Sequence, residues 1–443
     1  MPSPLLEAPA RPGLPSGTPL RPAEKAGARR SAAIRDPFID ILRVFGMALV
    51  VLQHWTMPML AFDGERITTG NALSSPGMFV VTWISQVMPL VFFAGGAANG
   101  IAWRRATIKG EAAPSWLAVR LRRLSWPLLP LAAVWLPLPH LLHALGVPGH
   151  PVDTAARLAG QLLWFLAVYL IAVTVTPLML KADMLYGWRV IVALVAGAVA
   201  GDLLRFGTGI DALGYANVIF VWLAVHQLGL RYSEGRLPRT GPWPWIMTLA
   251  GFGTAAALVA LGPYPGSMIG MPGAAVSNMA PPTLALLAVC FGQIGLALLL
   301  RTRINRLAAR PRVAAVAAWA APRMMTVYLW HMTALAVVTG VVIVGVGFST
   351  PTPWTFPWFA GWPLWLALLA GALWPLLRCF AKFEKPAALP YGTPGVLGIG
   401  VALGLTGAGI LTLMISGFVP GPAPLLGTLA LVAGIVLTLP RAR

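Results

Sequence analysis

Three polar side chains in the first apolar segment are the residues best placed to do chemistry. Asp40, Arg43 and His54 lie within residues 38–60, a run that is apolar enough to enter a bilayer. A charged side chain in the middle of a membrane span costs roughly 2.5 to 3.5 kcal/mol on insertion scales, so such residues usually serve a function. Because a neutral histidine is the usual general base near pH 7, His54 is a candidate base.

The spacing of these three residues places them on one stripe of a helix. An α-helix turns about 100° per residue, so the step from Arg43 to His54 is three full turns plus about 20°. Asp40 lies about 40° from His54 on the other side, and Arg43 and His54 are about 16 Å apart along the helix axis. Asp40 and Arg43 are three residues apart and can pair locally. The stripe predicts a helix that faces a protein interior or a polar cavity.

The composition predicts an integral membrane protein. The chain has 443 residues, of which 58% are hydrophobic and only 10% are charged, whereas a soluble domain has about 25% charged residues. Continuous apolar runs near 20 residues indicate helices, since barrel strands alternate. We therefore expect an all-α polytopic transmembrane helix bundle of 10–12 spans. The candidate spans lie at about 38–60, 77–103, 124–145, 160–180, 188–205, 213–231, 245–262, 282–300, 323–347, 358–378, 395–417 and 422–439. Four prolines predict that the span at 124–145 is kinked.

The distribution of basic residues predicts the orientation of the chain. With the N-terminus in the cytoplasm, 28 of the 32 Lys and Arg residues fall in the tail, in cytoplasmic loops and at the C-terminus. This asymmetry favours two cytoplasmic termini in a multi-pass protein of the cytoplasmic (plasma) membrane. The net charge of +19 is then an orientation signal with affinity for anionic membrane lipid, and it does not indicate a nucleic-acid partner. Residues 1–35 are expected to be a disordered basic tail, because they contain no apolar run.

Other polar residues in the apolar segments leave alternatives open. His331 is either a second catalytic candidate or a core histidine that bonds a neighbouring helix, and for His226 the core interpretation is favoured. Asp202 and Arg205 either pair near the outer surface or serve a function. The cysteines Cys290 and Cys379 lack metal-ligand spacing, so no metal site or disulfide is expected.

Several motifs resemble those of the acyltransferase 3 family of integral membrane acyltransferases. The specific one is Arg43-x10-His54, preceded by Ile39-Asp40. Weaker matches are Met88-Pro-Leu-Val-Phe-Phe-Ala-Gly-Gly96, Trp164-Phe-Leu with Tyr169, and Tyr328-Leu-Trp-His331. The resemblance covers roughly residues 36–378, and the family typically has about ten such helices. It implies a membrane acyltransferase domain at 36–390 and an additional C-terminal helix pair at 391–443.

The resemblance also implies an activity and roles for residues. Members move an acyl group, often acetyl, from acyl-CoA to a hydroxyl or amine of an envelope sugar, a lipid or a small metabolite. His54 fits the general base, with His331 as a second candidate, and Arg43 fits a cation for donor phosphates. Asp40 would orient Arg43. The basic loop at 104–123, which includes Arg104 and Arg105, is either an entry surface for acyl-CoA or ordinary cytoplasmic charge.

The main alternative from a different functional class is a proton-coupled secondary transporter. Twelve spans suit one, and Asp40 or Asp202 could couple protons. The sequence shows no convincing internal repeat, which weighs against it. A non-catalytic scaffold does not explain why the first helix carries Arg43 and His54.

Overall fold

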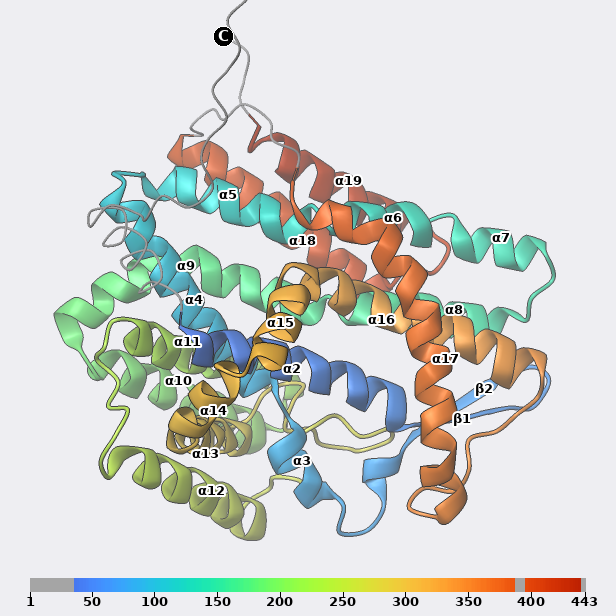
Figure 1. Ribbon diagram of the computed structural model, residues 1–443, viewed down its shortest axis with the longest axis horizontal. Helices are drawn as coiled ribbons and strands as arrows, with labels where there is room; N and C mark the ends of the chain where they lie inside the picture. The colour runs from blue at the N-terminus through green and yellow to red at the C-terminus, as the bar shows by residue number, and fades with distance from the viewer. Residues whose placement is uncertain (1–35, 387–394, 440–443) are drawn as a thin grey trace, which may run out of the picture. The chain divides into compact units, whose positions relative to one another are not determined.

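The computed structural model describes residues 36–386 and 395–439, and this part of the chain is helical apart from one two-stranded hairpin (Figure 1). The all-α prediction is confirmed, while the predicted tail at 1–35 lies outside the described residues. The longer elements are α2 (Pro37–Thr56), β1 (Pro58–Phe62), β2 (Ile67–Asn71), α3 (Phe79–Ser85), α4 (Met88–Ile108), α5 (Ala113–Ser125), α6 (Leu128–Trp135), α7 (Leu138–Ala144), α8 (Gly149–Gln161), α9 (Trp164–Tyr186), α10 (Arg189–Thr208), α11 (Asn217–Ser233), α12 (Trp243–Leu261), α13 (Leu284–Leu299), α14 (Arg301–Ala308), α15 (Pro311–Ala320), α16 (Met324–Thr339), α17 (Phe356–Phe380), α18 (Val396–Ser416) and α19 (Pro422–Val436). Short 3₁₀ segments and a π-helical turn at Gly340–Gly345 complete the described helices.

The number of spans agrees with the predicted range. Ten helices of the described chain are long and apolar enough to cross a membrane, or eleven if the bent pair α13–α14 counts as one span. The twelfth predicted run is α19, which has only 15 residues. The predicted kink at 124–145 is confirmed, since this stretch divides into α5, α6 and α7 with Pro127 and Pro137 at the breaks. The cytoplasmic location of both termini stays a prediction.

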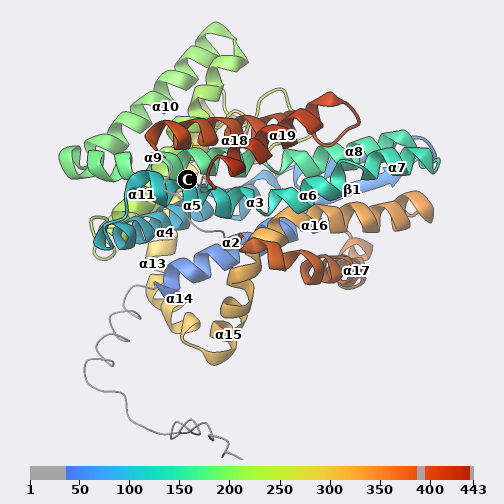
Figure 2. The same cartoon turned by 90° about the horizontal axis from the view of Figure 1, so that it is seen from above.

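Helix α2 is continuous from Pro37 to Thr56 and contacts several helices that lie far away in the sequence (Figure 2). Gly46 faces Val91 of α4, and the ring of Phe38 lies 5.7 Å from that of Tyr232 on α11. Because the helix has no break, the predicted spacing of Asp40, Arg43 and His54 holds. All three side chains are partly exposed, and the polar cavity that the stripe predicts stays a prediction.

Helices α4 and α11 pack with their backbones in close contact, and glycines make this approach feasible. A Cβ atom on Gly96 of α4 would overlap the carbonyl oxygen of His226, and one on Gly229 of α11 would overlap the carbonyl oxygen of Phe93. Small residues at such positions let membrane helices gain van der Waals contact. This close approach also brings Asn99 within hydrogen-bonding distance of His226, at 3.1 Å.

The chain turns back directly after α2 in the antiparallel hairpin of β1 and β2, which the sequence analysis did not predict. Pro58 pairs with Asn71 and Phe62 with Ile67. At the turn, the amides of Glu65 and Arg66 donate to the Asp63 carboxylate, and these hydrogen bonds lower the pKa of Asp63 below its usual value.

Two contacts hold this hairpin in place. The Leu60 amide donates to the Thr350 hydroxyl at 2.8 Å, and the Thr350 amide donates to the Leu60 carbonyl oxygen at 2.9 Å. The Ile67 amide donates to His150 Nδ1 of α8 at 3.2 Å. The hairpin therefore fixes the end of α2 that carries His54.

We predict that Gly229→Ala destabilises the fold, because the added methyl group would force α4 and α11 apart. Overpacking of this kind typically costs about 1–3 kcal/mol. The measurement is the thermal unfolding midpoint of the purified protein in detergent, which should fall. Gly371→Ala is the matched control, since a Cβ at that helical glycine of α17 meets no atom within 4 Å. An equal effect of the two changes would contradict this account of the α4–α11 contact.

Candidate active site

The two predicted catalytic histidines lie in direct contact. His54 of α2 and His331 of α16 are 277 residues apart in sequence, yet His54 Nδ1 is 2.8 Å from His331 Nε2. His331 is fully buried, whereas His54 is partly exposed. The structure therefore brings the two residues together as one pair and leaves His54 as the accessible member.

The two imidazole rings meet edge to edge in nearly one plane. They are inclined by only 7°, and their centroids lie 5.1 Å apart. The distance between the centroids exceeds the 2.8 Å between the two nitrogens by 2.3 Å. This difference is twice the distance from the centre of an imidazole ring to one of its atoms. Both nitrogens thus lie on the line that joins the centroids, which is the geometry of a straight N–H···N hydrogen bond.

The partners of His331 determine which nitrogen atoms carry protons. His331 Nδ1 faces the carbonyl oxygens of Tyr328 at 2.8 Å and Val327 at 3.2 Å, and a carbonyl oxygen only accepts. The proton of neutral His331 is therefore on Nδ1, and its Nε2 has the lone pair. It follows that His54 Nδ1 donates to His331 Nε2, so that His54 Nε2 has a free lone pair. In this arrangement His54 Nε2 is a base directed away from its partner.

Two tryptophans hold the backbone around this pair. The Trp55 indole donates to the carbonyl oxygen of His331 at 3.0 Å, and the Trp365 indole of α17 donates to the carbonyl oxygen of Trp55 at 2.7 Å. Trp55 is buried. The contacts join α2, α16 and α17 beside the histidines and fix the position of both rings.

Arg43 lies in a second, cationic part of the stripe. Arg120 of α5 is within electrostatic range of Arg43, Arg123 and the hydroxyl of Tyr169. Arg43 and Arg123 each repel the positive charge of Arg120, so an anion bound beside Arg120 would relieve the repulsion. Arg120 and Arg123 belong to the stretch 104–123 that was expected to be a basic loop, but both lie on helix α5, and their spacing of three residues is a signal that they share a face.

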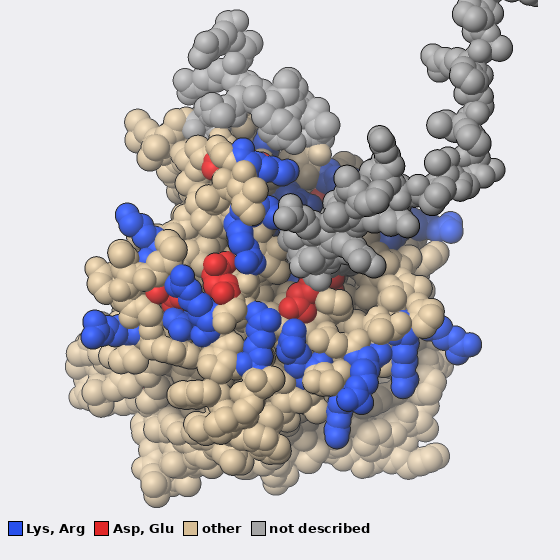
Figure 3. Space-filling view, turned by 60° about the vertical axis from the view of Figure 1, so that its left-hand side comes forward, with Lys and Arg blue, Asp and Glu red and all other residues tan. Residues whose placement is uncertain are grey.

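The other predicted donor-binding residues have partners of their own. The Arg104 guanidinium donates to the carbonyl oxygen of Ser233 at 3.0 Å and lies 3.9 Å from the Glu234 carboxylate, at the end of α11. Arg105 is exposed. Figure 3 shows Lys and Arg side chains gathered across one face of the molecule. Asp40 is one turn before Arg43 on α2, and its role in orienting Arg43 stays a prediction.

The remaining polar residues that the sequence singled out have structural surroundings. His226 Nε2 is bonded by Asn99, which fits the favoured core interpretation. The Asp202 carboxylate accepts from Asn217 at 2.7 Å, from the Leu284 amide at 2.7 Å and from Tyr264 at 3.0 Å. Burial and the neighbouring Asp202 charge raise the pKa of Tyr264.

Asp202 is thus fully engaged in holding the start of α13, and Arg205 is hydrogen-bonded to Asp211 at 2.8 Å. A carboxylate with three donors at structural positions does not suit a proton carrier. This arrangement weighs against the transporter alternative.

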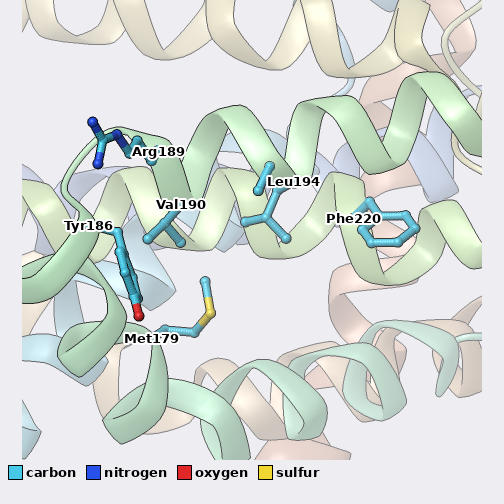
Figure 4. Close-up of a pocket in the computed structure, with 7 residues that line it drawn as sticks. Met179, Tyr186, Arg189, Val190, Leu194 and Phe220 are labelled. Carbon is cyan, nitrogen blue, oxygen red and sulfur yellow. The ribbon is translucent and has the colours of Figure 1, made fainter.

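A cavity of about 380 Å³ between α9, α10 and α11 contains none of the predicted site residues. In Figure 4, Val190, Leu194 and Phe220 lie beside this cavity, and the guanidinium of Arg189 points away from them. The residues in the described part of the chain contain no group of three His, Cys, Asp or Glu side chains that could hold a metal ion.

Comparisons with known proteins give one match. A family model described as an acyltransferase domain matches residues 36–381, which is well over half of the chain. No curated protein and no solved structure matches.

We predict that His331→Leu abolishes the fixed tautomer of His54, since leucine cannot accept the Nδ1 proton. The measurement is the pair of ¹⁵N chemical shifts of the His54 ring in histidine-labelled protein, assigned with a His54→Gln sample. Nδ1 should be protonated in the original protein, and both nitrogens should be partly protonated in His331→Leu. His331→Gln is the matched control, because its amide oxygen can still accept the proton. An unchanged tautomer in His331→Leu would show that another group sets it.

Proposed function

Because the chain belongs to the acyltransferase 3 family, we propose that it transfers an acyl group, with acetyl as the first candidate, from acyl-CoA to a hydroxyl or amine acceptor. The acceptor class is an envelope sugar, a lipid or a small metabolite. The protein is a multi-pass membrane acyltransferase, and we place it in the cytoplasmic membrane with both termini and the donor on the cytoplasmic side. The observation that supports this proposal best is the straight hydrogen bond between His54 and His331.

His54 Nε2 acts as the general base in this proposal. It removes the proton from the acceptor hydroxyl or amine while the acceptor oxygen or nitrogen attacks the thioester carbonyl carbon. The resulting tetrahedral intermediate collapses, the carbon–sulfur bond breaks, and the His54 imidazolium returns the proton to the departing thiolate. The products are the acylated acceptor and free coenzyme A. Throughout the reaction, His331 Nε2 accepts the hydrogen bond from His54 Nδ1–H. This bond stabilises the positive charge that forms on the His54 ring.

Arg43, Arg120 and Arg123 hold the donor phosphates in this proposal. A planar guanidinium binds two phosphate oxygens at once, and the electrostatic influence of Arg43 and Arg123 on Arg120 supports a shared anion site. Arg43 and His54 lie about 16 Å apart along α2. A donor held by its phosphates at Arg43 therefore extends its thioester arm along the stripe toward His54. Arg104 and Arg105 are entry residues for the donor rather than parts of the innermost site.

We predict that His54→Ala lowers the rate of acyl transfer by about 10²–10⁴, the typical effect of losing a positioned base. The assay uses purified protein with acetyl-CoA and a mixture of envelope-derived and small-molecule acceptors, and donor binding is measured separately. Donor affinity should stay unchanged, because the phosphate site lies at the other end of the stripe. His140→Ala, which changes an exposed histidine of α7, should have no effect. Near-normal turnover of well-folded His54→Ala would rule out the proposed base.

We predict that Arg43→Lys raises the KM for acyl-CoA by about tenfold, because a lysine ammonium cannot replace the bidentate contact of a guanidinium with phosphate. Arg43→Ala should raise the KM for acyl-CoA further than Arg43→Lys does. Steady-state kinetics with varied donor gives the values, and Arg66→Lys in the exposed turn of the hairpin is the matched control. If lysine at position 43 gives normal donor affinity and turnover, the phosphate role of Arg43 is wrong.

A further inference from the structure

Residues 301–323, which we call the arginine hairpin, form a strongly basic segment between two spans. They contain six arginines and no acidic residue. The segment comprises α14, α15 and a short 3₁₀ turn, Ala321–Arg323, that leads into α16. None of the predicted catalytic residues lies in it, so its charge is not explained by the proposed acyl transfer.

The arginine hairpin leaves the bundle. Its first helix is bent by 58° from the axis of α13. No residue of α14 is buried, and Ala317 is the buried residue of α15. Figure 2 shows α14 and α15 as a V that extends away from the other helices. Ile304 packs against the core, but most of the arginine hairpin has few neighbours within the described protein.

The arginine hairpin is also not needed to cross the bilayer. The candidate span Pro311–Gly345 has 35 residues, which is about 52 Å of helix, whereas the hydrocarbon core is about 30 Å thick. Residues 324–345 already provide a sufficient length. Because an arginine in the hydrocarbon core costs several kcal/mol, we expect α14, with its three arginines, to lie outside the core, and residues 324–345 leave α15 free to lie outside it as well.

The surface of the arginine hairpin combines arginines with exposed apolar side chains. Arg303 and Arg306 lie about 60° apart around the axis of α14, and Arg310 follows in the exposed turn before α15. On α15, Val316 is 60% exposed and Trp319 is 46% exposed. The Arg323 guanidinium donates to the Trp319 carbonyl oxygen at 2.7 Å and lies 4.9 Å from the indole centroid. Tryptophan beside arginine is typical of the level of the lipid headgroups.

We infer that the arginine hairpin lies on the membrane surface and binds anionic phospholipid headgroups. The charge of Arg303, Arg306 and Arg310 is complementary to phosphate-rich lipid, and Val316 and Trp319 enter the interface between headgroups and acyl chains. A soluble nucleotide donor would give no reason for exposed apolar side chains beside the arginines. Arg301 has a different role, since its Nε donates to Tyr232 at 2.8 Å and anchors the start of the hairpin to α11.

The arginine hairpin leads directly into α16, so its binding to lipid would affect that helix. Only the turn Ala321–Arg323 separates α15 from the helix that carries His331. A hairpin held at the surface therefore restrains the N-terminal end of α16. We expect that anionic lipid steadies the position of the histidine pair.

The experiment uses the full chain in nanodiscs that hold one copy. A fluorophore that reports polarity is attached to Val316→Cys in a Cys379→Ser background, because Cys379 is exposed and Cys290 is buried. Discs of phosphatidylcholine receive increasing phosphatidylglycerol. The label should move into an apolar environment as phosphatidylglycerol rises, and high salt should weaken the change.

The variant Arg303→Gln/Arg306→Gln/Arg310→Gln should require more than about tenfold more phosphatidylglycerol, since each arginine near the surface contributes about a fivefold factor. The matched control is the same triple change to lysine, which keeps the charge and should keep the response. A label that stays equally polar in both lipids would overturn the inference, as would an unchanged response of the glutamine variant. Two parallel series use discs that hold two copies and neutral discs with added coenzyme A. A shift of the label to an apolar environment that occurs only in one of these series would assign the surface to another occupant and likewise overturn the inference.

Discussion

The hydrogen bond between His54 and His331 is the interaction on which the rest of the site depends. It joins the first helix to α16, across 277 residues of sequence. Within a membrane, an imidazole nitrogen without a partner is unfavourable, so each ring stabilises the other. The bond is also directional, because carbonyl oxygens fix the proton of His331 on Nδ1. One contact therefore satisfies Nε2 of the buried His331 and Nδ1 of the partly exposed His54, and it leaves a lone pair at His54 Nε2.

Several other buried polar groups in the described chain bond at helix ends or between helices, and this contrast sets the histidine pair apart. The buried Asp183 carboxylate binds Arg231 and Arg236, and Asn99 bonds His226 between α4 and α11. Gln293 donates to the carbonyl oxygens of Trp83 and Gln86 where α3 gives way to α4, at 2.8 Å each. In these cases a buried polar group at a helix end or between two helices gains the hydrogen-bond or ion-pair partner that water would otherwise supply. His54 differs, since it keeps an accessible nitrogen after its own bond has been made.

The sequence predicted those features that depend on local periodicity. The stripe of Asp40, Arg43 and His54 follows from the helical repeat, and α2 is indeed unbroken. The kinked third span follows from its prolines. By contrast, contact between His54 and His331 depends on how α2 and α16 pack, which one sequence does not encode locally. For the same reason the hairpin after α2 was missed, because its strands are short and its partners, Thr350 and His150, are distant in sequence. Ion pairing of Arg205 with Asp211 likewise depends on the turn after α10.

A single rigid helix gives the proposed reaction a fixed length. If Arg43 and His54 were on different helices, each relative movement of the helices would change the distance between the phosphate site and the base. On α2 both lie on one unbroken element, so the distance of about 16 Å is set by the helical rise. The partners of each residue then tune its chemistry from other helices, α5 for the cationic part and α16 for the base. This arrangement places the donor-binding residue and the base at separate positions and keeps the distance between them constant. Transfer from a long donor to a second substrate requires such fixed positioning.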